Sequence, residues 1–353
     1  MPLQSAGLAQ LQDAAAAPEA RPSAAQLLPG ARAAEGLGKL ELLLVRAAQA
    51  APKALAPAAA ELLRAGGKRI RPLLVLLSAR AANPLKRSPG RVALALTAEL
   101  VHSATLLHDD VIDDGLTRRG LPAPRIAYGN AVSVLAGDWL LTSSLDLALR
   151  SGAPGAVEAL VRTLRELVEG ESRQLALRGK TGFTAEDALQ ICHLKTGALF
   201  AFCGEAGALA ARAPDETRRA LQAFGLRAGA AFQIADDLLD FEADAATMGK
   251  AVLADVAEGK PSVPLAIALK RLPPLRDELT ALLALDPALP EDEVRGRIRA
   301  FAGRLARTGA LGAARRIAEK ERDAALAALA RVPESPTREL LGQVARLLLS
   351  RGR

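Results

Sequence analysis

Two acidic clusters inside apolar helical sequence constrain this chain more than any other feature. The first reads HDDVIDD over residues 108–114, and the second reads FQIADDLLDF over residues 232–241. Both contain D-D-x-x-D, and in a helix residues four positions apart share a face. Adjacent carboxylates repel one another and are costly to bury, so two such clusters in apolar surroundings imply bound cations. Oxygen ligands suit hard ions, and Mg²⁺ in particular combines a few carboxylates with substrate phosphates.

The remaining sequence favours helices. Aromatic residues make up only 3% of the 353 residues, and alanine and leucine dominate, whereas strands prefer β-branched and aromatic residues. We therefore predict an all-α fold of about ten helices in one domain over residues 36–353. Helix starts are predicted at Thr184, where Asp187 completes a capping pattern, and at Asp215. Residues 1–35 are rich in Ala, Pro, Gly and Gln, and we predict a mobile extension there.

Charge and apolar patterning exclude several classes of protein. The net charge is +7, but the arginines are scattered and few aromatic residues accompany them, so no nucleic-acid partner is expected. The N-terminus lacks a charged region followed by an apolar core, and no apolar stretch reaches the roughly 18 residues of a membrane span. The cysteines, Cys192 and Cys203, are predicted to be small buried residues in a reducing compartment. A cytoplasmic protein without a transmembrane segment is expected.

Short cationic motifs accompany the acidic clusters. They are GGKRIRP at 66–72, RRG at 118–120, KTG at 195–197, GK at 249–250 and EGKP at 258–261. Four of the ten lysines lie in these motifs, which indicates a need for a compact ammonium group. Carboxylates, bridging metals and cations together bind polyanions and stabilise a departing diphosphate. If the diphosphate leaves an allylic carbon, a carbocation results, and it needs a dry apolar pocket.

With GDW at 137–139, these motifs in their order resemble the trans-isoprenyl diphosphate synthases, which make farnesyl, geranylgeranyl and longer polyprenyl diphosphates. The resemblance covers residues 36 to the C-terminus. It implies an antiparallel helix bundle around a central cavity, usually as a homodimer. It also implies that isopentenyl diphosphate and an allylic diphosphate are the substrates. The allylic substrate would ionise, the isopentenyl double bond would attack, and the released diphosphate would take the proton. Three Mg²⁺ ions per site are implied, with Mn²⁺ as a substitute.

The resemblance also assigns roles to individual residues. The aspartates facing the metal ions would be Asp109, Asp110 and Asp113 for two ions, and Asp236, with Asp237 and Asp240 near it, for a third. The residues holding the allylic diphosphate would be Arg118, Lys195, Thr196, Gln233, Lys250 and Lys260. Those holding isopentenyl diphosphate without metal would be Lys68, Arg71, His102 and Arg119. We predict that the catalytic residues are Lys195, Thr196, Gln233 and Lys250.

Product length is predicted from the residues before the first acidic cluster. Short-chain members of the family tend to carry an aromatic residue four or five positions before Asp109, where this chain has Thr105 and Ala104. Small residues there predict a long-chain product of the kind used as a quinone side chain, passed on to a membrane. Geranylgeranyl and farnesyl diphosphates are the alternatives. The family often has glycine at the place of Leu253, so the loop there is expected to be stiffened or reshaped.

Three other classes of protein fit the sequence less well. A di-iron bundle needs Glu-x-x-His on two helices, and Glu99 with His102 gives only one such motif. A non-catalytic regulatory subunit of a heteromeric prenyl synthase typically loses aspartates, whereas both clusters are intact here. A terpene cyclase need not bind isopentenyl diphosphate, which leaves Lys68, Arg71 and Arg119 unexplained.

Overall fold

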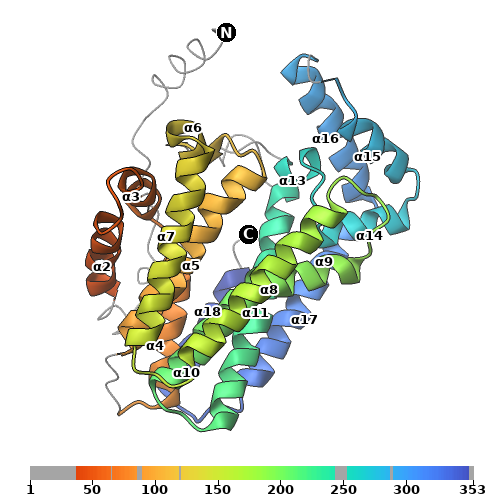
Figure 1. Ribbon diagram of the computed structural model, residues 1–353. Coiled ribbons are helices and arrows are strands. Elements are labelled where there is room, and N and C mark those ends of the chain that lie inside the picture. The colour runs from red at the N-terminus through yellow and green to blue at the C-terminus, as the bar shows by residue number, and fades with distance from the viewer. Residues whose placement is uncertain are drawn as a thin grey trace. The chain divides into compact units, whose positions relative to one another are not determined.

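The computed structural model describes residues 37–64, 66–85, 90–118, 121–242, 253–286 and 289–349. These residues are almost entirely helical, which confirms the predicted all-α class (Figure 1). They form more than the ten or so helices predicted, because the part after the second acidic cluster is divided into short pieces. The predicted extension at 1–35 lies outside the described residues.

The chain divides into two compact units, residues 1–70 with 100–143 and residues 71–99 with 144–353. A single domain over 36–353 stays a prediction. In the first unit, the elements are α2 (Leu37–Gln49), α3 (Ala56–Arg64), the second half of α5 (Gly90–Ile112), the two-residue strands β1 (Thr117–Arg118) and β2 (Leu121–Pro122), α6 (Pro124–Tyr128) and α7 (Asn130–Arg150) as far as residue 143. The strands are antiparallel, with Thr117 opposite Pro122.

Hydrogen bonds join α2, α3, α6 and the turn after α3 in the first unit. The Tyr128 hydroxyl of α6 donates to Glu61 Oε2 of α3 at 2.7 Å. The buried Arg69 donates from Nε to Glu41 Oε1 of α2 at 2.7 Å and from Nη2 to the Leu63 carbonyl at 2.8 Å. Arg69 also has a φ of 48°, a left-handed conformation that is unfavourable for arginine. These two hydrogen bonds therefore fix the turn of the GGKRIRP segment.

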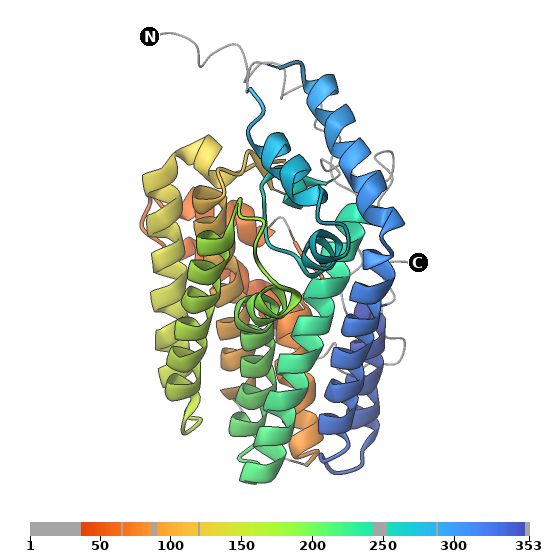
Figure 2. The same ribbon diagram turned by 90° about the vertical axis from the view of Figure 1, so that its right-hand side faces the viewer.

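The second unit is built around α11 (Asp215–Glu242). This helix packs along α10 (Ala198–Ala210) on one side and α17 (Ala310–Leu329) on another (Figures 1 and 2). The α10–α11 contact is close because Gly204 and Gly225 lie in it. A Cβ atom at either position would come within 2.1 Å of a carbonyl oxygen of the opposite helix. The spacing of these two helices is therefore set by backbone against backbone.

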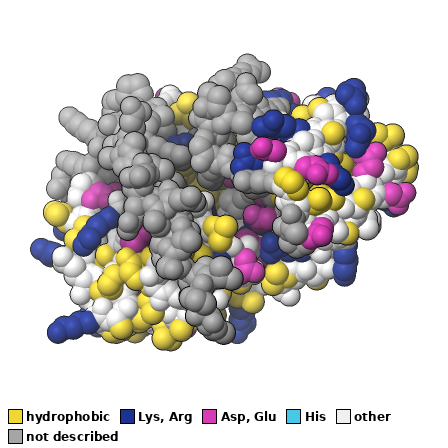
Figure 3. All heavy atoms as spheres, turned by 90° about the horizontal axis from the view of Figure 1, so that it is seen from above, with side chains coloured by type: hydrophobic (Ala, Val, Ile, Leu, Met, Phe, Trp, Pro, Cys, Tyr) yellow, Lys and Arg dark blue, Asp and Glu magenta, His cyan; other side chains and the backbone are white. Residues whose placement is uncertain are grey.

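The second unit has further elements besides α10, α11 and α17. They are α4 (Ile70–Ala82) from residue 71, the first part of α5 as far as residue 99, the last part of α7 from residue 144, α8 (Ala156–Leu177), α9 (Ala185–Cys192), the π-helical turn η2 (His193–Gly197), α13 (Ala254–Ala257), α14 (Val263–Arg271), α15 (Leu275–Leu283), α16 (Glu291–Arg307) and α18 (Pro336–Leu349). Around α15 and α16, at the right of Figure 3, acidic and basic side chains alternate, and Arg304 pairs with Glu278 at 2.7 Å.

Both predicted helix starts are confirmed. The Thr184 hydroxyl accepts from the Asp187 amide at 3.1 Å, while the Thr184 amide donates to the Asp187 carboxylate at 2.8 Å. This reciprocal capping box begins α9 and satisfies two amides that the helix itself leaves unpaired. The next predicted start, Asp215, is the first residue of α11. Cys192 and Cys203 are both free and buried, as predicted.

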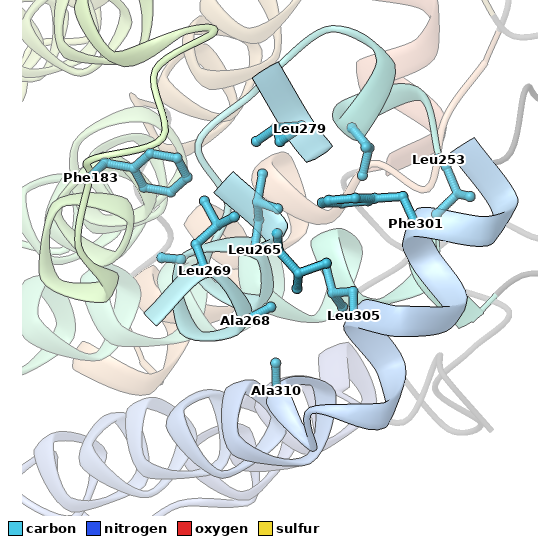
Figure 4. Packing of buried hydrophobic residues seen from close by; sticks show 12 residues of the cluster. Phe183, Leu253, Leu265, Ala268, Leu269, Leu279, Phe301, Leu305 and Ala310 are labelled. Atoms are coloured by element: carbon cyan, nitrogen blue, oxygen red, sulfur yellow. The ribbon is translucent and has the colours of Figure 1, made fainter. Parts of the chain in front are cut away.

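Leu253 belongs to an apolar cluster that draws mainly on α14, α15 and α16, with Phe183, Val256 and Ala310 from neighbouring segments (Figure 4). Its side chain is 3% exposed and lies with Leu279 and Phe301 in that cluster. Its φ is 66°, in the left-handed region that glycine adopts freely and leucine does not. Burial of the side chain therefore holds the backbone in a strained turn just before α13.

One described helix, α7, is long and apolar enough to span a bilayer by length and composition. It has 21 residues, a mean hydropathy of 1.3 over its best window, and a third of that window is buried. The helix was not predicted as a membrane span from the sequence, because Asp138 and Asp146 lie within its apolar residues. Such a helix is weak evidence for a membrane span, because core helices of water-soluble proteins meet the same criterion.

Candidate active site

The first acidic cluster lies in the last turn of α5, in the first unit. Asp109 and Asp113 are partly exposed, whereas the side chain of Asp110 is only 1% exposed. Asp110 Oδ1 accepts a hydrogen bond from Arg118 Nε at 2.9 Å, so strand β1 places a cation against the cluster. Asp110 Oδ2 is buried and has no hydrogen-bond partner among the described residues. A buried carboxylate oxygen without a partner is costly, and a bound cation would satisfy it.

A histidine connects the same end of α5 to α7. His108 Nε2 lies 3.3 Å from Asp138 Oδ1 and 3.2 Å from the Val134 carbonyl oxygen. Its ring packs on Gly137, where an added Cβ would lie 2.3 Å from Nε2. The GDW motif therefore contributes a small residue and a carboxylate that hold the helix end preceding Asp109. No role for His108 was predicted from the sequence.

Other predicted residues of this unit lie on α5 or just before α4. His102 and Thr105 are partly exposed, and Thr105 Oγ1 donates to the His102 carbonyl at 2.8 Å. Ala104 is fully buried. Lys68 is partly exposed in the turn that Arg69 fixes. The predicted isopentenyl ligand Arg119 lies outside the described residues.

In the second unit, the structure brings three predicted residues into one hydrogen-bonded chain. Thr196 Oγ1, in the π-helical turn, donates to Gln233 Oε1 of α11 at 2.6 Å. Gln233 Nε2 then donates to Asp237 Oδ1 one turn later at 2.9 Å. Lys195, beside Thr196, forms an ion pair with Glu171 of α8. The KTG motif is thus joined to the second acidic cluster through the side chain of Gln233.

The second acidic cluster includes a residue that the sequence analysis missed. The Asp255 amide of α13 donates to Asp240 Oδ2 at 3.1 Å, which brings a further carboxylate to the end of α11. Burial, with added repulsion from Asp255, Asp236 and Asp240, raises the pKa of Asp237 well above its usual range despite the Gln233 hydrogen bond. Burial and Asp240 likewise raise the pKa of Asp255 to about 6, although Lys260 opposes this. Such crowding favours a bound cation.

The carboxylates do not form a complete metal site by themselves. Within the described part of the chain, no three His, Cys, Asp or Glu side chains converge closely enough to hold an ion. This agrees with Mg²⁺ chemistry, in which water and substrate phosphates complete the coordination sphere. The EGKP motif contributes Lys260, whose Nζ lies 2.6 Å from Glu258 Oε2. Lys250, which is also predicted to bind the allylic diphosphate, lies outside the described residues.

Arg71 is held against aromatic rings in the same unit. Its guanidinium lies 5.2 Å from the centroid of the Phe200 ring, which stacks on Phe232 at 5.8 Å. Burial lowers the pKa of Arg71, while the charges of Glu99 and Asp236 act in the opposite direction. The position of Phe232, directly before Gln233, was the only signal in the sequence for these rings. The two rings provide an apolar, non-nucleophilic wall beside Arg71, which is predicted to bind isopentenyl diphosphate.

Comparison with known proteins decides the family. Residues 52–295 match the sequence model of the polyprenyl synthetase family. The chain belongs to the polyprenyl synthetase family. It is 34% identical to octaprenyl diphosphate synthase of Escherichia coli over 82% of this chain and 87% of that protein. It is also 35% identical to component 2 of the heptaprenyl diphosphate synthase of Geobacillus stearothermophilus, over 88% of this chain and 94% of that protein.

Solved structures of polyprenyl synthetases share the fold. A decaprenyl diphosphate synthase from Rhodobacter capsulatus superposes with a TM-score of 0.82 at 32% identity, covering 91% of this chain and 99% of that one. A polyprenyl synthase from Caulobacter crescentus, complexed with calcium and isoprenyl diphosphate, gives a TM-score of 0.83 at 34% identity, covering 91% and 97%. These likenesses confirm the resemblance inferred from the motifs.

Proposed function

We propose that this polyprenyl synthetase condenses isopentenyl diphosphate with an allylic diphosphate to give a long-chain trans-polyprenyl diphosphate. The observation that carries the proposal is the chain from Thr196 through Gln233 to Asp237, with Lys195 beside it. It places an ammonium group, two neutral hydrogen-bonding groups and an acidic cluster together. A departing diphosphate and the carbocation it leaves require these groups. The similar octaprenyl and decaprenyl diphosphate synthases support a long-chain product.

The residues present fit Mg²⁺. The unsatisfied Asp110 Oδ2 and the crowded carboxylates of Asp237 and Asp255 are hard oxygen donors with excess negative charge. The aspartates of α5 and α11 would hold the ions, which neutralise the diphosphate and make it a better leaving group. Three ions per site, with Mn²⁺ as a substitute, are part of the proposal. The protein holds the allylic diphosphate by its cations, and Thr196 and Gln233 stabilise the developing positive charge.

The decisive experiment is an assay of the purified chain with farnesyl and labelled isopentenyl diphosphates. We expect Mg²⁺-dependent extension, loss of activity in EDTA and recovery with Mg²⁺ or Mn²⁺. Chromatography of the dephosphorylated products then gives their length. Products that stop at geranylgeranyl diphosphate would replace the long-chain proposal with that alternative. In a parallel assay primed with geranyl diphosphate, a product that stops at farnesyl diphosphate would replace it with the farnesyl alternative. Undiminished activity in EDTA would refute the metal-dependent mechanism.

A heteromeric enzyme is the second candidate, favoured by the similarity to a protein named as component 2 of a heptaprenyl synthase. Both acidic clusters are intact here, which supports a catalytic chain over a non-catalytic regulatory subunit. The same assay separates the candidates. A purified chain that is folded but inactive alone, and active after addition of a second protein from the source extract, would establish the heteromer.

We propose that α5 also sets product length. Ala104 is fully buried, whereas Thr105 is partly exposed one turn before Asp109. Ala104→Phe and Thr105→Phe therefore form a matched pair. The ring that enters the substrate channel should shift products to shorter chains, and a ring forced into the packed core should lower stability by about 1–3 kcal/mol without that shift. Unchanged products in both folded variants would remove these positions as the floor of the channel.

A homodimer is part of the proposal, and an exposed apolar face on α8 supports it. Val168 is 71% exposed there, Val161 is 37% exposed, and Leu149 at the end of α7 is 71% exposed. The charges around this face are arranged to suit a second copy. An antiparallel copy on a two-fold axis between Arg165 and Glu166 would set Glu158 opposite Arg173. Such self-complementarity is what a two-fold interface requires.

The oligomeric state tests this face directly. Val168→Glu should convert the dimer to a monomer in light scattering after size exclusion, because it buries an unpaired charge in the contact. Lys320→Glu, on α17, is the control and should leave the dimer intact. A wild-type monomer at micromolar concentration would refute the dimer. A cytoplasmic location, with the product passed to a membrane, completes the proposal.

A further inference from the structure

The π-helical turn η2 is an irregularity in the backbone that carries Lys195 and Thr196 of the candidate site. It occupies His193–Gly197, between α9 and α10, and the backbone stays helical on both sides. A π-turn inserts an extra residue into the helical repeat, so it rotates the side chains that precede it relative to those that follow. Such turns are rare, and they need support from their surroundings. Lys195 and Thr196 lie inside this one.

One support comes from α17. His193 Nε2, in the first residue of the turn, lies 2.9 Å from Glu321 Oε2. The carboxylate of Glu321 is only 9% exposed, and it also accepts from Arg227 Nη1 of α11 at 3.0 and 3.2 Å. Burial alone would raise the pKa of Glu321, but the hydrogen bonds and charges of His193 and Arg227 outweigh it and lower that pKa. The start of the turn is thus connected to α17 and to the helix that carries Gln233.

The opposite support comes from α8. Gly170 packs directly on the turn, and a Cβ added there would lie 2.9 Å from Leu194 Cβ and 3.0 Å from the Lys195 amide nitrogen. The next residue, Glu171, pairs with Lys195. The turn is therefore confined between a backbone surface on α8 and the buried carboxylate on α17. Of these contacts, the carboxylate connection can be removed without touching Lys195 or Thr196.

We propose that His193 and Glu321 are positioning residues, which hold the π-helical turn so that Lys195 and Thr196 meet the allylic diphosphate. This inference rests on the proposed function, because it takes the allylic substrate to bind at Lys195 and Thr196. The proposal assigns neither His193 nor Glu321 a contact with the reacting atoms. Their effect on the reaction passes through the backbone of the turn and through the Thr196–Gln233 hydrogen bond of 2.6 Å.

Glu321→Gln tests the proposal with little change in shape. The amide keeps the size of the side chain but loses the charge that binds His193 and Arg227 together. We expect kcat/KM for the allylic substrate to fall by about 10²-fold, the effect of a 1 Å displacement of a positioned group. The KM for isopentenyl diphosphate should stay within about twofold of wild type. The double variant His193→Gln/Glu321→Gln should be no worse than the single variants, since both break one connection.

Glu205→Gln is the matched control. Glu205 is also a buried carboxylate, 3% exposed, and it joins two arginines of the same unit, Arg162 and Arg218, without contacting the turn. It should lower the melting temperature as much as Glu321→Gln while leaving allylic kcat/KM near wild type. Wild-type allylic kcat/KM in folded Glu321→Gln, or an equal loss in both variants, would overturn the positioning role. An inactive wild type would instead refute the proposed function, and this role with it.

Discussion

The strained turn at Leu253 allows a test in which glycine and alanine should exchange their usual order of stability. Leu253 combines a φ of 66° with a side chain that is 3% exposed. Leu253→Ala keeps the strained backbone and leaves a cavity, which should cost about 2–5 kcal/mol of unfolding free energy. Leu253→Gly loses the contacts of Cβ as well, but relieves about 1–2 kcal/mol of left-handed strain. Part of that relief is offset by the greater chain entropy of glycine, about 0.5–1 kcal/mol.

The expected result is that the unfolding free energy of Leu253→Gly exceeds that of Leu253→Ala by up to about 1 kcal/mol. Leu279 is the control because it belongs to the same cluster, is 1% exposed and lies in the middle of α15. There, glycine should be less stable than alanine by about 1 kcal/mol. Urea titrations of the four variants measure both differences. If glycine is the less stable residue at both positions, the backbone at Leu253 is not strained and the argument fails.

Three further results are expected. Asp236→Ala should lower turnover by several orders of magnitude while the circular dichroism spectrum stays folded, and near-normal turnover would contradict its role in the acidic cluster. Lys68→Ala should raise chiefly the KM for isopentenyl diphosphate and Lys195→Ala that for the allylic substrate, so equal effects on both would count against separate cations. Because burial raises the pKa of Cys203 to about 12 and that of Cys192 well above its usual range, a thiol reagent at pH 8 should react with the unfolded chain only; rapid labelling of folded protein would show that these thiols are accessible.

Local sequence signals predicted the parts of the structure that local physics controls. The capping pattern at Thr184 and the acidic start at Asp215 located two helix beginnings, because the groups that satisfy a helix end lie within one turn of it. The D-D-x-x-D patterns indicated both acidic helices because residues four positions apart share a helical face. Family membership followed from the order of motifs, which the comparisons confirm.

Features that depend on distant partners were not predicted. Asp255 reaches Asp240 across 15 positions, and its only signal was its place just before the EGKP motif. The partnership of His193 with Glu321 spans 128 positions, and neither residue lies in a motif. No residue pattern within the π-helical turn predicts it, because the contacts that support the turn come from α8 and α17. The pairing of Arg118 with Asp110 likewise depends on the hairpin of β1 and β2. Strands of two residues are too short to show the alternation of apolar and polar residues that predicts a strand.

The glycine contacts between α10 and α11 limit how this chain can diverge. Backbones that touch through Gly204 and Gly225 leave no rotamer by which a larger side chain could be accommodated. The distance from the π-helical turn to Gln233 should therefore stay constant wherever the spacing of these two helices is kept. New product lengths or primer preferences have to arise elsewhere in the chain, so relatives that differ widely in product can keep one unaltered ionisation site.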